Sequence, residues 1–223
     1  MNYKKPSGFL SPKKGGITMD HYFTDNRHLA QNRKEITFRF SCFTCHFLTD
    51  NGVFCKDHVD FGTRTLLDAV HASGLLGEEV LDLGCGYGVI GITLKKQYPD
   101  SAFTLAEVNP RALELAQENA ARNGAEVTCV CSDVYSGVEG NTFTDILTNP
   151  PIRAGKKVIY QMFEQAYDHL REGGRLWVVI RKQQGAASAR EKIAQVFGSC
   201  EIISREKGYL VLLAKKVDKL TGD

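Results

Sequence analysis

The sequence predicts an α/β fold: a mostly parallel, seven-stranded sheet with helices on both faces, a terminal antiparallel hairpin and a small N-terminal β cap. Three observations support this fold class. Beyond residue 60, short apolar runs of strand length alternate with segments of helical apolar spacing. Turn residues separate the two kinds of segment, as at Asn123-Gly124. The last two apolar runs are joined only by residues 205–208, which is a hairpin connection.

The expected elements follow in order along the chain. Pro110 stands where one helix begins, because a proline there removes only an N–H that has no partner within the helix. The Gly173-Gly174 pair is expected to close a later helix. The expected strands are 79–83, 102–107, 127–131, 145–148, 175–180, 201–204 and 209–214. The expected helices are 63–73, a stretch through Lys96, 110–123, 158–171 and a stretch through Ile193 to Phe197.

The first part of the chain has a different pattern. Residues 1–18 combine four lysines with prolines and a Gly-Gly pair, which predicts a flexible basic tail, and Met19 is an alternative start. Between residues 35 and 54, aromatic and polar residues alternate around Asp50-Asn51-Gly52, which predicts short antiparallel strands with a tight turn there. The expected division is a tail of residues 1–18, a β extension of residues 19–62, the α/β domain of residues 63–216 and a C-terminal tail of residues 217–223.

Composition limits the class of protein. Lys and Arg number 28 against 26 Asp and Glu, and a net charge of +2 neither argues for nor excludes nucleic-acid contact. No window approaches the roughly 18 apolar residues of a membrane span, so no membrane association is expected. The first 18 residues lack the apolar stretch and cleavage site of a secretory signal.

The seven cysteines favour a reducing, cytoplasmic setting, because their number is odd and Cys129 and Cys131 lie inside an apolar run. Cys42, Cys45 and His46, with Cys55 nearby, suggest zinc at first sight. A structural zinc site usually needs a second pair of ligands, which the sequence does not offer. We therefore expect strand packing for these residues and no metal.

The segment from Val80 to Gly88 predicts a ligand-binding loop. Its glycines at 84, 86 and 88 follow a buried strand, where they allow a tight turn and a close approach of backbone to a ligand. The spacing Gly86-x-Gly88-x-x-Gly91 also matches the dinucleotide fingerprint. Asp82 favours S-adenosylmethionine instead, because a carboxylate attracts its ammonium and sulfonium groups and repels a pyrophosphate. The alternative role for Asp82 is to cap the following turn.

Two more carboxylates stand at the ends of the next two strands. Glu107 suits a ribose diol, and Asp133 suits the exocyclic amine of adenine, although each residue type is also common as a helix cap. Carboxyl ends of successive parallel strands meet at one edge of a sheet, where open α/β sheets bind ligands. The expected cofactor-binding residues are therefore Asp82, Gly84, Cys85, Gly86, Gly88, Glu107, Val108, Asp133 and Asn149.

The segment Asn149-Pro150-Pro151-Ile152 follows the fourth expected strand and is the expected catalytic segment. Two prolines end the strand and stiffen the turn, so the Asn149 side-chain oxygen and a main-chain carbonyl are held in fixed directions. Two such acceptors suit an –NH2 group, which has two protons to donate. A purely structural turn is the alternative for this segment taken alone.

Together these motifs resemble known families. Asp82-Leu-Gly-Cys-Gly-Tyr-Gly88 with Asn149-Pro-Pro-Ile152 resembles the class I S-adenosylmethionine-dependent methyltransferases that act on planar amino groups. The string from Asn149 to Lys157, with Gly52-Val-Phe54 and Asp60-Phe-Gly-Thr63, resembles the ribosomal small-subunit guanine-N2 methyltransferases over about residues 19–216. The resemblance implies a Rossmann-like fold, methyl transfer to guanine N2, and ribosomal RNA or the small ribosomal subunit as partner, with no obligate protein partner evident. Ile152 departs from relatives with an aromatic residue there, and this chain has one catalytic copy where a tandem relative has two.

Basic residues near the expected site are candidate RNA contacts, namely Arg153, Lys156, Lys157, Arg181 and Lys182. Such residues also simply solvate a surface. Within amine methylation, adenine N6 or a protein glutamine is an alternative acceptor. Different classes are a nicotinamide oxidoreductase, which leaves Asp82 and the Asn-Pro-Pro segment unexplained, and a non-catalytic RNA-binding assembly factor.

Overall fold

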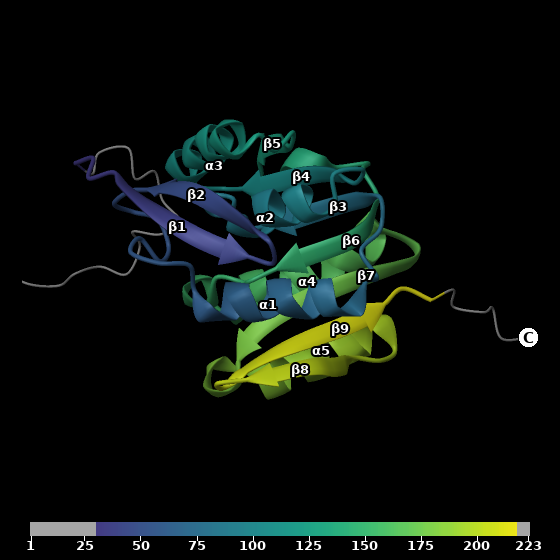
Figure 1. The fold of residues 1–223 in the computed structure, drawn as a ribbon. Helices are drawn as coiled ribbons and strands as arrows, with labels where there is room; N and C mark the ends of the chain where they lie inside the picture. Colours follow the sequence, from purple (N-terminus) through teal and green to yellow (C-terminus); the bar gives the residue numbers. More distant parts are fainter. Residues whose placement is uncertain (1–29, 218–223) are drawn as a thin grey trace, which may run out of the picture.

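A computed structural model describes residues 30–217 (Figure 1). The predicted tail of residues 1–18, the alternative start at Met19 and nearly all of the predicted C-terminal tail lie outside this range. The strands are β1 (Lys34–Phe40), β2 (Phe43–Thr49), β3 (Glu79–Leu83), β4 (Ala102–Glu107), β5 (Thr128–Cys131), β6 (Phe143–Thr148), β7 (Leu170–Arg181), β8 (Glu201–Glu206) and β9 (Tyr209–Lys215). The helices are α1 (Phe61–Ser73), α2 (Val89–Gln97), α3 (Pro110–Asn123), α4 (Lys156–His169) and α5 (Ala186–Phe197), with short 3-10 turns at Ser136–Val138, Ile152–Ala154 and Lys182–Gln184.

The main sheet confirms the predicted fold class. Its seven strands lie in the order β5-β4-β3-β6-β7-β9-β8, and β9 runs antiparallel to both of its neighbours. From β3 the chain moves outward through β4 and β5, and then returns to place β6 on the other side of β3. This reversal of strand order leaves a crevice at the carboxyl ends of β3 and β6, where doubly wound sheets bind ligands. The glycine loop after β3 and Asn149 after β6 both face this crevice.

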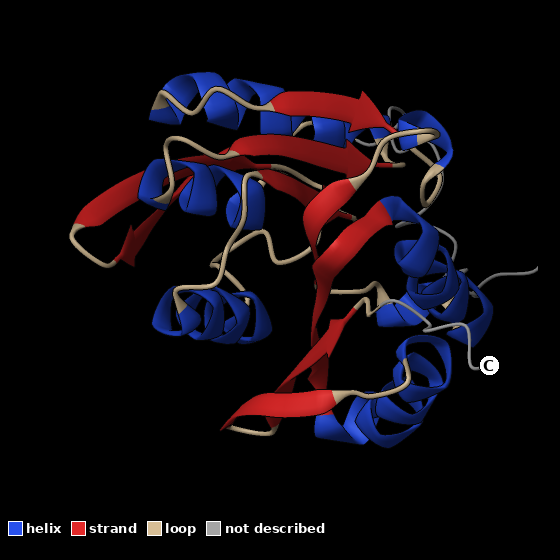
Figure 2. Cartoon of the chain, turned by 90° about the vertical axis from the view of Figure 1, so that its right-hand side faces the viewer, coloured by secondary structure: helices blue, strands red, loops and turns tan. Residues whose placement is uncertain are grey.

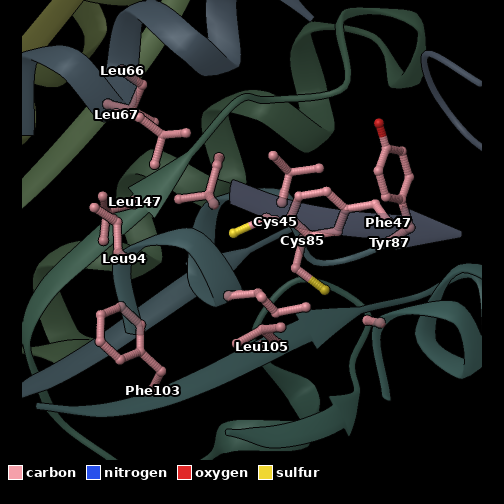
Figure 3. Close-up of a cluster of buried hydrophobic side chains, with 14 of the residues drawn as sticks. Cys45, Phe47, Leu66, Leu67, Cys85, Tyr87, Leu94, Phe103, Leu105 and Leu147 are labelled. Atoms are coloured by element: carbon pink, nitrogen blue, oxygen red, sulfur yellow. The ribbon is translucent and has the colours of Figure 1, made fainter. Parts of the chain in front are cut away.

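Two apolar layers, one on each face, hold the sheet. Figure 2 shows helices on both sides of the strands. Alternate residues of a strand point to opposite faces. Ile146 therefore belongs to the apolar cluster that includes residues of α4 and α5, whereas Leu147 belongs to the cluster that includes residues of α1, α2 and the hairpin. Figure 3 shows part of the layer that contains Leu147, where Leu66 and Leu67 of α1 lie near it. Trp177, fully buried in β7, belongs to the same layer.

The predicted N-terminal β cap is an antiparallel hairpin of β1 and β2, but the expected position of its turn is wrong. The turn is at Ser41-Cys42, with Phe40 paired to Phe43, and Asp50-Asn51-Gly52 follows the hairpin. Asp50 is buried there, and its carboxylate accepts hydrogen bonds from the backbone N–H groups of Asn32 and Asn51. The division into units of residues 19–62 and 63–216 stays a prediction.

Helix α3 fastens this hairpin to the rest of the protein with two asparagines. The Asn123 amide accepts from the His46 N–H and donates to the His46 carbonyl, at 2.9 and 2.8 Å. The Asn119 amide does the same to Leu48, at 2.6 and 3.0 Å. The spacings match, because four helical residues rise about 6 Å and two strand residues about 6.7 Å. The two amides therefore satisfy the outer edge of β2 as a neighbouring strand would.

A second difference concerns Gly173-Gly174, which was expected to close a helix over 158–171. Helix α4 ends earlier, at His169, and the glycine pair lies inside β7. The register between β6 and β7 shifts just there, and Gly173 has φ +77°. A Cβ on Gly174 would lie 2.8 Å from the Arg171 carbonyl oxygen, so the pair permits a bulge that other residues would obstruct.

Within residues 30–217, no group of three or more His, Cys, Asp and Glu side chains is placed to hold a metal ion. The seven cysteines are free, and Cys45 packs fully buried in the hairpin. No helix in the same range is both long and apolar enough to cross a bilayer.

Candidate active site

A cavity of about 840 Å³ opens at the carboxyl ends of the parallel strands. The loops after β3, β4, β5 and β6 line it, and so does the segment from Gly52 to Cys55 that follows the hairpin. Of the predicted residues, those lining it are Gly84, Cys85, Gly86, Glu107, Val108, Asp133, Asn149, Pro150, Pro151, Ile152, Arg153 and Arg181. The others, Asp82, Gly88, Lys156, Lys157 and Lys182, lie outside the lining. Segments far apart in the chain thus meet at one site.

The glycine loop divides into two parts with different roles. Gly84 and Gly86 have φ of +72° and +57°, and a Cβ on either would project into open space, with no contact closer than 4.0 Å. Their backbone is therefore exposed to the cavity without a side chain in between. Gly88 has φ +92°, but a Cβ there would lie 2.7 Å from the Ile92 side chain. The first two glycines thus face the cavity, and the third allows α2 to pack.

Asp82 lies behind this loop and is only 1% exposed. Its Oδ2 accepts from the Gly91 N–H in the first turn of α2 at 2.8 Å, and its Oδ1 is buried with no hydrogen-bond partner among the described residues. The pKa of this carboxyl is raised to about 7, mainly by burial; the Gly91 N–H opposes the rise, and the nearby Glu107 carboxylate adds to it. One oxygen therefore caps α2, the alternative role considered above. Pairing of the other oxygen with a cationic ligand stays a prediction.

Glu107 ties the end of β4 to the glycine loop. Its Oε2 accepts from the Gly86 N–H at 2.9 Å, and its Oε1 accepts from the Asn109 N–H at 2.8 Å. Burial raises the pKa of this carboxyl, although these backbone N–H groups oppose the rise. Asp133 is exposed in the loop after β5, on the cavity wall. Both carboxylates stand where the sequence predicted them, and their ligand contacts stay predictions.

The Asn149 amide has a fixed orientation. Its Nδ2 donates to Asp60 Oδ2 and to Thr63 Oγ1, both at 3.0 Å. Both amide protons are thus engaged, so Oδ1 is the side-chain atom left to accept a hydrogen bond in the cavity. The preceding Thr148 donates through Oγ1 to the Leu83 carbonyl at 2.8 Å, which joins the ends of β6 and β3. The Asn149–Ile152 segment and the glycine loop are therefore held side by side.

Sequence reasoning missed several residues that shape this site. Asp60, Thr63 and Tyr209 line the cavity but entered the sequence analysis only as part of a resemblance or a strand. The local signal for Asp60 is that of a helix N-cap, which it also is, since its Oδ2 accepts from the Thr63 N–H at 3.1 Å. Phe54 also lines the cavity and is 52% exposed. Nothing in the local pattern distinguishes these residues from structural ones.

The N-terminal extension also braces the glycine loop through Tyr87. The Tyr87 ring packs edge-on against Phe47 of β2, with ring centroids 6.1 Å apart (Figure 3). Its hydroxyl donates to the Cys55 carbonyl at 3.2 Å, and its own carbonyl accepts from Asn119 at 2.9 Å. The hairpin therefore supports, from behind, a residue of the cavity wall.

Comparison with known families shows which family the chain belongs to. The model of the methyltransferase small domain family matches residues 44–213, which include the glycine loop and the Asn-Pro-Pro segment. The chain belongs to this family. The match begins inside β2 and ends in β9, so it includes most of the hairpin's second strand and the whole cavity.

Individual proteins are similar to this chain over most of its length. Protein YbxB of Bacillus subtilis (strain 168) is 43% identical over 89% of this chain and 99% of its own length. Ribosomal RNA small subunit methyltransferase C of Actinobacillus pleuropneumoniae is 35% identical over 73% of this chain and 50% of its own length. This chain spans about half the length of the ribosomal RNA methyltransferases that it matches.

Solved methyltransferases share the fold. A 16S rRNA N2 G1207 methyltransferase of T. thermophilus, solved with AdoMet and guanosine, superposes with a TM-score of 0.76 at 25% identity, over 82% of this chain and 50% of that one. The architecture is therefore that of the S-adenosylmethionine-dependent methyltransferases, as the resemblance implied.

Proposed function

We propose that this chain transfers the methyl group of S-adenosylmethionine to an exocyclic amine of ribosomal RNA, with guanine N2 of the small-subunit RNA as the target. One observation carries the proposal: both protons of the Asn149 amide are bound by Asp60 and Thr63, so its oxygen is presented to the cavity. An acceptor at that place, beside an open glycine loop, suits an –NH2 group next to a methyl donor.

The residues around the cavity fit S-adenosylmethionine. The donor supplies a methyl group already activated by its sulfonium, so positioning is the main task of the protein. Gly84 and Gly86 offer backbone without a side chain toward the cavity, and Glu107 offers a carboxylate at the end of β4 for a ribose diol. Asp82 Oδ1, which is buried without a hydrogen-bond partner among residues 30–217, carries negative charge behind the loop when the carboxyl is ionised, and this charge favours a cationic ligand over a pyrophosphate.

The Asn-Pro-Pro segment suits a weakly nucleophilic amine. The lone pair of guanine N2 is delocalised into the ring, and hydrogen bonds from its two protons to Asn149 Oδ1 and the Pro150 carbonyl favour a pyramidal nitrogen. The same acceptors stabilise the positive charge that develops on that nitrogen during transfer. The chain thus contributes orientation and electrostatic stabilisation without a covalent intermediate.

Ribosomal RNA is supported by the relatives rather than by the geometry. The similar proteins are named for methylation of the small subunit and also of the large subunit, and the T. thermophilus structure contains guanosine. Arg153 and Arg181 line the cavity, where they suit phosphate contacts, whereas Lys156, Lys157 and Lys182 are exposed near it. We therefore place the RNA backbone along the rim formed by the segments after β6 and β7.

The experiment that tests this proposal is methyl incorporation from labelled S-adenosylmethionine. Small-subunit and large-subunit RNA, both naked and in assembled subunits, are compared with tRNA and release factor. Mass mapping of the labelled RNA identifies the nucleotide. N2-methylguanine in small-subunit RNA supports the proposal, while N6-methyladenine or a methylated glutamine assigns an alternative acceptor. Binding of a nicotinamide cofactor in place of S-adenosylmethionine contradicts it.

Phe54 is expected to hold the target base. The residue after the two prolines is Ile152, which has no aromatic face, and Phe54 presents its exposed ring to the same cavity. Stacking of a base on an aromatic ring contributes about 1–3 kcal/mol. We expect Phe54→Ala to raise the KM for RNA about tenfold, with the affinity for S-adenosylmethionine unchanged. Leu75→Ala, which removes an equally exposed apolar side chain outside the cavity, is the matched control. Equal KM values for the two variants contradict this role.

The affinity for S-adenosylmethionine is expected to depend on pH through Asp82, whose pKa burial raises to about 7. A cationic ligand stabilises the ionised carboxylate, so the protonated fraction must lose its proton on binding, and affinity weakens as pH falls below 7. We expect Kd to rise about tenfold from pH 8 to pH 6, from the size of a one-unit protonation cost. Calorimetry across this range measures it, and Asp82→Asn should remove the dependence. A flat profile means that Asp82 only caps α2.

A further inference from the structure

We propose that Asp60 is a positioning residue, which fixes the Asn149 side chain with its carbonyl oxygen toward the cavity. The inference rests on the proposed function, because it gives Asn149 the role of acceptor for the substrate amine. Asp60 is 89 residues away in sequence and belongs to a different element, the N-cap of α1.

The contacts of Asp60 join that helix end to the catalytic segment. One carboxylate oxygen, Oδ2, accepts from the Thr63 N–H at 3.1 Å and from Asn149 Nδ2 at 3.0 Å. Thr63 Oγ1 receives the Asn149 amide as well, at 3.0 Å. The first turn of α1 therefore binds the nitrogen side of the Asn149 amide from two directions.

Asp60 determines which end of the Asn149 amide, oxygen or nitrogen, points to the cavity, whereas Thr63 alone would allow both orientations. A hydroxyl both donates and accepts, so Thr63 would satisfy either face of an amide. An ionised carboxylate only accepts. If the Asn149 amide were reversed, its oxygen would face Asp60 Oδ2 at about the present 3.0 Å, and its NH2 would face the substrate amine, donor against donor. The carboxylate excludes this arrangement.

The carboxylate itself is closely confined. A Cβ on Gly62 would lie 2.8 Å from Asp60 Oδ2 and 2.6 Å from the Tyr209 ring, so only glycine lets these groups approach one another. The Tyr209 hydroxyl donates to the other carboxylate oxygen, Oδ1, over a longer distance of 3.4 Å. Because the carboxylate has little room to move, its hydrogen bond also holds the Asn149 amide in one place, as a positioning role requires.

Two substitutions separate this role from helix capping. Ser and Asn are both as good as Asp at an N-cap, so both preserve the start of α1. The serine hydroxyl lies one bond closer to the backbone, so it no longer accepts the hydrogen bond from Asn149 Nδ2. The asparagine oxygen, held by the Thr63 N–H, keeps Asn149 in its orientation. For Asp60→Ser we expect kcat to fall by about tenfold or more, with the Kd for S-adenosylmethionine and the unfolding midpoint unchanged, and Asp60→Asn to recover most of this loss.

A second measurement does not depend on turnover. Solvent exchange of the Asn149 side-chain amide protons, followed by NMR on the full chain with S-adenosylmethionine, should be slow in the parent and in Asp60→Asn and fast in Asp60→Ser. Protected protons in Asp60→Ser overturn the inference, and so does an unchanged kcat in that variant. A loss of rate in Asp60→Asn as large as in Asp60→Ser, with the amide still protected, also overturns it, because charge rather than orientation would then be required. If the parent does not methylate RNA, the proposed function fails while the exchange measurement still tests Asp60.

Discussion

Replacing Asn149 by alanine is expected to lower methyl transfer by at least about 10²-fold, the scale measured when one preorganised group that stabilises charge is removed from an active site. The variant loses the acceptor that the amide presents to the cavity. Its glycine loop is expected to be unchanged, because the Asn149 side chain donates its hydrogen bonds to Asp60 and Thr63, which lie outside that loop. Single-turnover methylation measures the effect, and the Kd for S-adenosylmethionine, measured separately, is expected to stay the same.

The control for this substitution is Asn141→Ala, which removes an exposed asparagine away from the cavity lining. Turnover by Asn149→Ala at the rate of this control would contradict the catalytic role of the segment. A loss of cofactor affinity that matches the loss of rate would show instead that Asn149 serves binding.

Replacing Asp145 by alanine is expected to destabilise the fold by about 3–5 kcal/mol, a large share of the total stability of a domain. The fully buried Asp145 carboxylate accepts two bonds from Arg175, at 2.8 and 2.9 Å, one from Trp177 Nε1 at 2.8 Å and one from the Gly77 N–H at 2.8 Å. Its removal leaves a guanidinium and two N–H groups without their acceptor. Urea denaturation monitored by Trp177 fluorescence measures the change.

A neighbouring ion pair gives the comparison for Asp145. Glu79 and Arg171 are separated by 3.9 Å with both side chains nearly half exposed, so Glu79→Ala is expected to cost less than about 1 kcal/mol. The two variants each remove one carboxylate near the same strands and differ in burial. Equal midpoints for the two would contradict a structural role for the Asp145 network.

The sequence predicted the alternation of strands and helices well, because buried strands and amphipathic helices have different apolar periods. It failed where one signal has two structural uses. Gly173-Gly174 is compatible with a helix end and with a strand bulge, and only the pairing of β6 with β7 distinguishes them. Likewise, Asp50-Asn51-Gly52 is a typical hairpin turn sequence, but Ser41-Cys42 connects the two strands, and Asp50-Asn51-Gly52 follows the second strand.

The same reasoning separates the predictable from the unpredictable parts of the site. Gly84, Gly86 and Asn149 are in local motifs whose chemistry can be read directly. The partners of Asn149 could not be read, because its bond to Asp60 depends on where α1 packs relative to β6. Tyr87 also has a role visible only in the fold, since it contacts the hairpin and α3 at once.

The paired asparagines of α3 have a consequence for assembly. Exposed strand edges recruit strands from other molecules, and this is a common route to aggregation. On β2 the groups that would recruit such a strand, at His46 and Leu48, already bond to Asn123 and Asn119. The helix thus covers the β2 edge of this small hairpin, so that this edge does not act as a template for a strand of a second chain.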